Sequence, residues 1–301
     1  MEVTDLMGTA VRLSTPILIA ALGEIIVERA GMFNFGIEGI MLIAAFASFT
    51  TAFISNNIWL GLLAGVSSGI LLGLIFAITA IKLKIHQGVC GITIWFLGLY
   101  LSSLLYDLFF AGKLLSIREI GLFPIHIPLL SQIPILGPIF FRQNIFIYAI
   151  FFLIPICYIL MFRTTFGLKI RATGENPRAA ESLGINVHRI RYISVVIGAM
   201  LAGIAGCYFS LGSVYTYRHN LVAGRGFIAF ALVWFGKWTI KWVVIGAFLF
   251  GSIEMLAIYI LTIGIPISPY VVYMFPYVAA LLALVMRRGK GGCPAAMGVP
   301  Y

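Results

Sequence analysis

The sequence predicts an all-α fold, a polytopic bundle of about eight or nine membrane-spanning helices. Of the 301 residues, 61% are hydrophobic and only 10% are charged, and the mean hydropathy is +1.07. A soluble domain carries about 25% charged residues, so this chain has too few polar side chains to cover a surface exposed to water. The composition therefore argues against a soluble enzyme, a disordered chain and a nucleic-acid-binding domain.

The apolar runs give the number of helices. A helix that crosses a bilayer needs about 20 mostly apolar residues. A ninth apolar piece, 226–236, is too short to cross alone, which predicts a broken crossing near 213–236, with a re-entrant loop as the alternative. No long polar linker divides the chain, so residues 1–301 are expected to form a single transmembrane domain. Eight runs are long enough to cross: 10–27, 36–54, 58–81, 89–110, 144–162, 190–212, 241–262 and 268–286.

The first apolar run is expected to remain in the protein. The residues before it, MEVTD, are acidic, whereas a cleaved signal peptide begins with a basic segment. The remaining runs alternate in direction, so the basic residues between them indicate the orientation of the whole chain.

The net charge of +10 is interpreted as a sign of orientation in the membrane, because loops rich in Lys and Arg stay in the cytoplasm. Residues 163–191 contain six basic residues against only Glu175 and Glu181, and are expected to be cytoplasmic. Alternation then places the N-terminus outside and the C-terminus in the cytoplasm of an inner-membrane protein. The basic residues that fall on the cytoplasmic side are Lys82, Lys84, Arg163, Lys169, Arg171, Arg178, Arg189, Arg191, Lys237, Lys241, Arg287, Arg288 and Lys290.

The segment 111–143 is expected to form an external, proline-rich loop. Its four prolines prevent a regular helix, yet the segment is apolar, so it should lie against the membrane surface or on the bundle. It could serve as a simple connector or as a surface for a partner. The prolines are Pro124, Pro128, Pro134 and Pro138.

The sequence contains no catalytic, metal or cofactor motif. The four Cys and four His are scattered and form no ligand cluster, and there is no GxSxG or HExxH motif. There is also no GxxxxGK[ST] loop, so any energy from ATP must come from another polypeptide.

Ionisable residues within apolar sequence indicate where transport could occur. Glu24, Glu28, Arg29 and Glu38 lie in the stretch 23–41, which four glycines interrupt. Buried charges face a partner or a water-filled cavity, and a broken helix is tolerated where it lines such a cavity. The stretch is therefore a candidate gate or pathway element. The alternative is a short cytoplasmic turn in which Glu24, Glu28 and Arg29 are solvated.

A weak internal repeat relates this stretch to the broken crossing. Residues 34–46 resemble 222–234, and a register that matches Gly39 with Gly226 also matches Glu38 with Arg225. Repeats often build transporters, with the site at the repeat interface. We therefore predict that Glu38 pairs with Arg225; two unrelated charged helix ends are the alternative.

The segment 164–191 contains the signals of a short helix. Asn176 is a good N-cap, Pro177 fits the first helical position, and Gly184 fits the position that ends a helix, which predicts a helix over 177–183. Its small apolar edge, formed by Ala179, Ala180 and Leu183, could insert into a groove of a soluble partner. Alternatively, the helix lies on lipid.

Four segments together resemble a known family. They are 23–49, 167–191, 224–238 and the ending CPAAMGVPY (293–301). The chain is similar to permease subunits of bacterial ABC importers in the branched-chain amino acid/ribose permease superfamily, and most similar to the nucleoside-type branch. The stretch FGKWTIKW (235–242) departs from the pattern, since it carries Thr239, Ile240 and Lys241 where relatives often have Asn, Pro and small residues.

The resemblance implies partners and residue roles. It implies half of a heterodimeric pore in the lipid membrane, completed by a second permease subunit, an ABC ATPase inside and a substrate-binding lipoprotein outside; no nucleic acid and no cofactor are expected. The segment GENPRAAESLG becomes the part that docks on the ATPase, and its matching residues are Gly174, Glu175, Asn176, Pro177, Ala180 and Gly184.

The resemblance to the nucleoside-type branch makes a nucleoside the expected substrate, and a nucleoside would suit an apolar pore with aromatic faces. A simple sugar or a riboflavin-like vitamin is the alternative. An ion-coupled secondary transporter would instead use Glu24, Glu38, Asp107 or Glu254 as a relay, and an intramembrane enzyme would need a nucleophile and base that are not visible. The candidate pathway residues are Phe33, Asn34, Phe35, Glu38, Arg225, Phe227 and Trp234.

Overall fold

The computed structural model describes residues 3–128, 130–134, 136–263, 268–286 and 292–301. This part of the chain is a helical bundle, which confirms the predicted all-α fold. Its helices are α1 (Val3–Arg29), α2 (Ile37–Ser55), α3 (Ile58–Ala77), α4 (Gln87–Phe110), α5 (Leu136–Phe140), α6 (Ile145–Arg163), α7 (Thr165–Glu175), α8 (Pro177–Ser182), α9 (Val187–Cys207), α10 (Arg225–Phe235), α11 (Ile240–Thr262) and α12 (Pro269–Met286).

Most predicted spans agree with observed helices within a few residues. Two are extended by π-helical turns, η1 (Ile78–Lys82) after α3 and η3 (Tyr208–Ser213) after α9. The first helix begins seven residues earlier than predicted, at Val3, because Asp5 in its first turn is favourable at a helix N-terminus. Seven helices of the described chain are long and apolar enough to cross a membrane: α1, α2, α3 with η1, α4, α6, α9 with η3, and α11.

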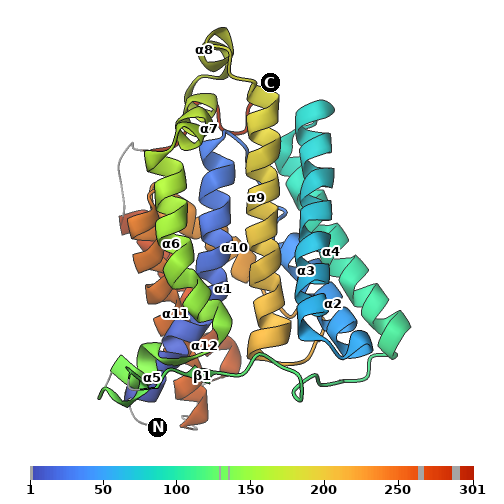
Figure 1. Cartoon of the computed structure of the whole chain (residues 1–301), viewed down its shortest axis with the longest axis vertical. Helices are drawn as coiled ribbons and strands as arrows, with labels where there is room; N and C mark the ends of the chain where they lie inside the picture. The colour runs from blue at the N-terminus through green and yellow to red at the C-terminus, as the bar shows by residue number, and fades with distance from the viewer. Residues whose placement is uncertain (1–2, 129, 135, 264–267, 287–291) are drawn as a thin grey trace.

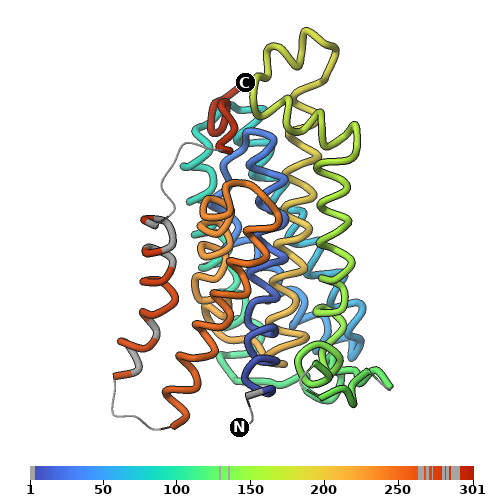
Figure 2. Tube along the Cα trace, turned by 90° about the vertical axis from the view of Figure 1, so that its left-hand side faces the viewer, coloured from blue at the N-terminus to red at the C-terminus, as the bar shows by residue number. Residues whose placement is uncertain are grey.

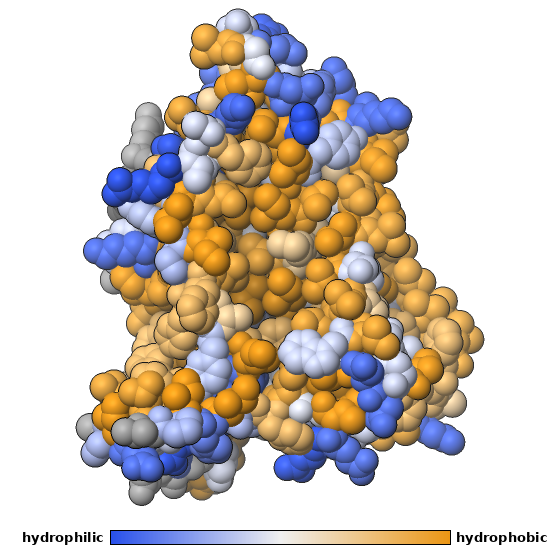
Figure 3. Space-filling model, in the orientation of Figure 1, coloured by the Kyte–Doolittle hydropathy of each residue, from blue (hydrophilic) through white to orange (hydrophobic). Residues whose placement is uncertain are grey.

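The helices run up and down between two polar ends. The N-terminal end of α1 lies at one end of the bundle, and α8 and the C-terminal residues lie at the other (Figure 1). A broad apolar belt covers the visible face between these ends, where lipid would contact the protein (Figure 3). The last turn of α3 and residues 163–191 lie at the α8 end, as the distribution of charge predicts. The predicted cytoplasmic residues Arg287, Arg288 and Lys290 lie outside the described residues.

The short helix α10 belongs to a true crossing. At the end of the bundle far from α8, the Thr216 hydroxyl donates to the carbonyl of Leu115 (2.6 Å). At the α8 end, the Arg29 guanidinium donates to the carbonyl of Trp238 (3.1 Å). Residues 214–238 therefore pass from one end to the other, with an irregular stretch followed by eleven helical residues, as the orange trace shows (Figure 2). The predicted broken crossing is confirmed, and the re-entrant loop is wrong.

Small residues let the central helices approach closely. Four glycines recur every four residues on α3, namely Gly61, Gly65, Gly69 and Gly73, and therefore share one face. A Cβ on Gly73 would lie 2.2 Å from the Cβ of Ala199 on α9, and one on Gly61 would lie 2.6 Å from the carbonyl of Ser48 on α2. Such small-residue faces drive helix packing in lipid, where helices gain no hydrophobic free energy from each other.

The proline-rich segment covers the end of the bundle opposite α8. Its described residues form short elements: the antiparallel strands β1 (Ile125–His126) and β2 (Arg142–Gln143), the 3₁₀ turn η2 (Leu130–Gln132) and α5. Its Ile117 amide donates to the carbonyl of Tyr215 (2.9 Å), and its Leu122 amide donates to the carbonyl of Leu211 (3.1 Å). The segment therefore packs on the bundle and contacts the start of the broken crossing.

Candidate functional site

Two interrupted helices meet inside the bundle at Glu38. The chain leaves α1, runs through an irregular linker over residues 30–36, and starts α2 with Glu38 in its first turn. The Gly224 amide donates to one carboxylate oxygen of Glu38 (2.7 Å), and the Gly226 amide donates to the other (2.6 Å). A buried carboxylate thus satisfies free N–H groups at the start of α10, which is where negative charge stabilises a helix.

The sequence at this junction follows from the close contact. A Cβ on Gly226 would lie 2.7 Å from a Glu38 oxygen, so only glycine fits there. Gly224 has a φ of +82°, a conformation that glycine adopts without strain. Irregular backbone at membrane depth is tolerated because its polar groups are satisfied by protein.

The predicted pair of Glu38 with Arg225 is wrong. The Arg225 guanidinium forms its ion pair with Glu254 on α11, where Nε donates to the carboxylate (3.0 Å), and it lies over the ring of Phe209. The Glu38 oxygens instead accept from backbone amides at the start of α10, and α11 supplies Glu254 as the partner of the guanidinium. From the sequence, Glu254 was considered only as an ion relay. It is a single carboxylate within an apolar helix, and this isolation could have indicated that it needs a buried cation as a partner.

A second buried carboxylate joins α1 to the other end of α10. Glu28 is 0% exposed, and its side chain accepts hydrogen bonds from the indole N–H groups of Trp234 (3.2 Å) and Trp238. Glu24, one turn earlier, is also buried. The alternative of a solvated turn is therefore wrong for both glutamates, because α1 continues through them to Arg29 with α10 packed against it.

Aromatic rings fill the space between the 30–36 linker and α10. The Phe33 and Phe35 ring centroids are 4.6 Å apart, and Phe230 packs against both, stacked on Phe35 at 4.7 Å. Trp234 closes the cluster beside Phe33 and Phe230. We call these four residues the aromatic cluster. Phe230 was missed from the sequence, although it lies four residues before Trp234, one turn away on the same helix.

Besides Glu38 and Arg225, two predicted pathway residues, Asn34 and Phe227, lie outside the aromatic cluster. Phe227 packs instead against Trp95 of α4, at 4.9 Å between centroids. The Asn34 side chain is buried and accepts a hydrogen bond from the Gly36 amide (2.9 Å), so it shapes the linker. The linker is held further by Gln87, whose side-chain oxygen accepts from the Phe33 amide (2.7 Å).

The coupling segment predicted from the sequence forms α7 and α8 at one end of the bundle. The Asn176 side chain accepts a hydrogen bond from the Ala179 amide (3.1 Å), with Pro177 in the first helical position. The helix ends at Ser182, one residue before the predicted end, and Gly184 follows with a φ of +81°. The N-cap, proline and glycine thus take the positions that the sequence indicates.

The apolar edge of α8 is turned differently from the prediction. Ala180 is only 2% exposed and packs inward, whereas Leu183 is 81% exposed. Glu175 and Asn176 are also exposed at the surface of this segment. Ala179 and Leu183, and not Ala180, are therefore the exposed members of the predicted apolar edge.

A C-terminal strap, residues 292–301, ties α7 to the linker beyond α1. The Ala296 amide donates to the carbonyl of Gly174 (2.9 Å), and the Gly298 amide donates to the carbonyl of Gly31 (3.1 Å). Gly174 itself presses on the end of α1, since a Cβ there would lie 2.2 Å from the carbonyl of Arg29. Sequence reasoning named Gly174 for docking; the structure gives it a contact inside the chain.

The strap also contacts α8 and α9. The buried Arg191 side chain on α9 donates through Nη1 to the carbonyl of Val299 (3.0 Å). The Tyr301 hydroxyl donates to the carboxylate of Glu181 on α8, and this bond raises the pKa of Tyr301. The strap therefore joins α7, α8, α9 and the 30–36 linker.

Comparison with known proteins identifies the family of the chain. Residues 6–285 match the family model described as "Branched-chain amino acid transport system / permease component". The chain is 35% identical over 300 residues to the guanosine ABC transporter permease protein NupQ of Bacillus subtilis, covering 96% of this chain and 93% of the relative. It is 36% identical over 303 residues to the nucleoside ABC transporter permease protein NupC of Lactococcus lactis, with the same coverage.

A third relative carries a different substrate in its name. TsgC13 of Haloferax volcanii, a permease provisionally named for glucose, is 33% identical over 264 residues, covering 88% of this chain and 80% of the relative. No solved structure matches the chain.

Proposed function

The chain belongs to the family of branched-chain amino acid transport system permease components, and from this premise we propose that it forms half of the pore of an ATP-driven nucleoside importer. It is a multi-pass membrane protein and the permease subunit of an ABC transporter, so the ATPase is a separate polypeptide. A second permease subunit completes the pore, and a substrate-binding lipoprotein delivers the nucleoside. The named relatives are ABC permeases, which favours this interpretation over an ion-coupled transporter.

The observation that carries the proposal is the continuous contact between α8 and the aromatic cluster. Gly174, at the end of α7, packs on the carbonyl of Arg29, and the strap binds Gly174 and Gly31 together. Gly31 is two residues before Phe33. A displacement of α8 by a motor therefore reaches the aromatic cluster through main-chain contacts, with no flexible side chain between them.

The orientation follows from the same segment. The basic residues of 163–191 lie at the α8 end, and positive loops stay in the cytoplasm. The ATPase then docks on α8 from the cytoplasm, and the N-terminal end of α1 and the proline-rich segment face outward. The lipoprotein meets the pore at that outer end.

The aromatic cluster is the feature that favours a nucleoside. Phe33, Phe35, Phe230 and Trp234 present flat π faces, and aromatic faces stack on nucleobases. The rings pack on one another here, so passage requires them to separate, and the cluster acts as the gate. A sugar is the second candidate, because the Haloferax relative is provisionally named for glucose.

Substrate class is tested by uptake into vesicles that contain the complete transporter. We expect labelled guanosine or adenosine to accumulate only with ATP, and unlabelled nucleosides to compete while glucose does not. Replacing Phe35 with Ala should weaken nucleoside uptake by roughly tenfold, because a base stacked on an aromatic side chain gains about 1–3 kcal/mol. Phe96→Ala, which removes a ring that packs with Trp95 and Tyr100, is the matched control. Glucose uptake with no nucleoside competition would overturn the substrate assignment.

Docking through α8 is tested by comparing two exposed leucines. Leu183→Ala should weaken binding of the ATPase by roughly tenfold or more, since burying a leucine at an interface contributes about 1.5–3 kcal/mol. Leu168→Ala, the same change at an exposed leucine of α7, should leave ATPase binding unchanged. Co-purification of the ATPase with each variant is the measurement. Equal retention by both variants would contradict the docking role of α8.

A further inference from the structure

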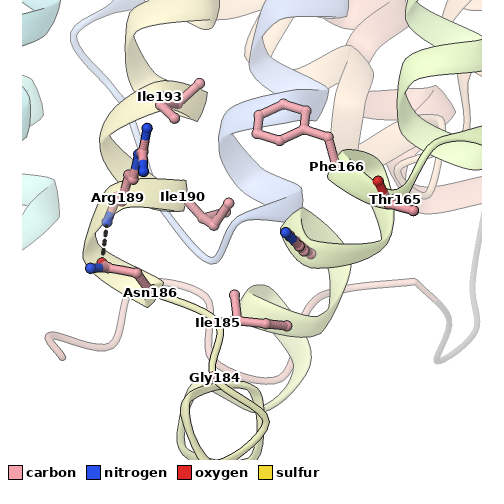
Figure 4. Close-up of a pocket in the computed structure, with 9 residues that line it drawn as sticks. Thr165, Phe166, Gly184, Ile185, Asn186, Arg189, Ile190 and Ile193 are labelled. Carbon is pink, nitrogen blue, oxygen red and sulfur yellow. Dashed lines mark hydrogen bonds between the residues drawn. The ribbon is translucent and has the colours of Figure 1, made fainter.

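A cavity with two basic residues lies between α7 and α9, beside the coupling segment. Its volume is about 360 Å³. Phe166 from α7 and Ile190 and Ile193 from α9 point into the space, while Gly184 and Asn186 form its α8 end (Figure 4). Lys169 and Arg189 also line it, and no carboxylate does. The site therefore combines apolar side chains with two cations.

The two cations have no counter-ion in the described part of the chain. The side chains of Lys169 and Arg189 are exposed, and neither forms an ion pair or hydrogen bond with a described residue. The Arg189 contact drawn in Figure 4 is its backbone amide, which donates to the side chain of Asn186. An anion bound in the cavity would therefore meet two cations on its walls and no opposing carboxylate.

A second cavity continues the first one along α6. It is about 350 Å³ in volume, shares Thr165 and Phe166 with the first, and extends over Ile156, Ile159 and Leu160. Ile156 and Ile159 are exposed on the apolar belt of the bundle, where lipid chains would contact the protein. The two cavities therefore adjoin at Thr165 and Phe166, and one is lined by two cations while the other is an apolar groove exposed to lipid.

We propose that this composite site binds an anionic phospholipid of the leaflet at the α8 end. The phosphate lies between Lys169 and Arg189, and one acyl chain follows the groove along α6. Basic pockets between helices at a membrane surface are known to bind such headgroups, and the groove supplies the apolar contact that a soluble phosphate would not use. The inference requires only that the bundle spans a membrane, so it does not depend on the transported substrate.

A lipid bound in this site would hold α7 in a fixed position relative to α9. Because α7 leads directly into α8, a lipid there would fix the angle at which the coupling segment leaves the bundle. The chemistry favours a lipid over the ATPase as occupant, since Ile156 and Ile159 of the groove are exposed on the apolar belt. The helix α8 projects from the end of the bundle (Figure 1).

The test is native mass spectrometry of the purified protein with added phosphatidylglycerol or phosphatidylcholine. We expect the wild-type protein to retain phosphatidylglycerol in preference to phosphatidylcholine. The variant Lys169→Gln/Arg189→Gln should lose affinity for phosphatidylglycerol by roughly thirtyfold, since each basic residue near an anionic headgroup contributes about 1 kcal/mol. Lys82→Gln/Arg178→Gln removes the same charge from the same end and should retain the lipid.

Two further experiments test whether the groove contributes to binding and whether the occupant is a lipid. Ile159→Ser, a change on the lipid-facing surface, should weaken phosphatidylglycerol binding with both cations intact. Inorganic phosphate should fail to displace the lipid. Equal binding of the two lipids, equal loss in the control variant, displacement by phosphate, or full binding by Ile159→Ser would each overturn the proposal. So would a Lys169→Gln/Arg189→Gln variant that retains phosphatidylglycerol but no longer co-purifies with the ATPase.

Discussion

Replacing Glu38 with alanine is expected to lower the free energy of unfolding by about 3–5 kcal/mol and to abolish uptake. The change leaves the amides of Gly224 and Gly226 without an acceptor inside the bundle. Each buried donor left unpaired destabilises by about 1–3 kcal/mol, and hydrogen bonds to a charged group lie at the upper end of this scale. The effect is measured as the melting temperature in detergent, where gel filtration monitors the loss of monodisperse protein on heating.

Two further variants separate the possible causes. Glu38→Gln keeps one side-chain oxygen and the shape of the residue, so its stability should fall between those of wild type and Glu38→Ala. Glu119→Ala makes the same truncation on the exposed proline-rich segment and should leave the stability unchanged. If Glu38→Ala had the same melting temperature as Glu119→Ala, the start of α10 would not depend on the Glu38 carboxylate.

The spans were predictable because a bilayer imposes one requirement on every helix. A helix needs about 20 apolar residues to cross, and apolar runs as long as 58–81 and 241–262 therefore indicate membrane-spanning helices. The broken crossing was predictable for the same reason, since 226–236 is too short to span and the alternation of basic loops still requires a passage there. The length and the charge of a segment can be read from the sequence alone, so predictions based on them need no knowledge of how the helices pack.

The contacts at the junction could be predicted only in part. The internal repeat related residues 34–46 to 222–234, and the structure indeed brings Glu38 onto Gly224 and Gly226. The repeat could not show that the carboxylate binds backbone rather than the Arg225 side chain. That outcome depends on the position of α11, which supplies Glu254 from outside the repeat.

Side-chain direction on α8 shows a similar limit. The cap signals at Asn176, Pro177 and Gly184 fix where the helix starts and stops. In six residues there are fewer than two turns, too few for a periodic pattern to indicate which face packs inward. The burial of Ala180 and the exposure of Leu183 depend on the contacts that α8 makes with the rest of the chain. These contacts cannot be predicted from the sequence of the helix.

Removing residues 296–301 is expected to reduce ATP-driven uptake at least tenfold while the protein still inserts into the membrane. The truncation deletes both main-chain bonds that join Gly174 to Gly31 through the strap, and it leaves the buried Arg191 without the carbonyl of Val299. Each neutral hydrogen bond contributes about 1 kcal/mol and the bond from the guanidinium about 1.5–3 kcal/mol, so the coupling segment loses several kcal/mol of attachment. The spans themselves keep their helix contacts, which is why insertion should persist.

Tyr301→Phe is the matched control for the strap, because it removes only the exposed bond to Glu181 and keeps the ring beside Arg191. It should retain most of the uptake. ATPase binding, measured by co-purification, should survive in both variants, since Leu183 remains exposed on α8. A truncated protein that binds the ATPase and hydrolyses ATP without moving substrate would place the strap between motor and gate. Full uptake by the truncated protein would show instead that the packing of Gly174 on Arg29 transmits the motion alone.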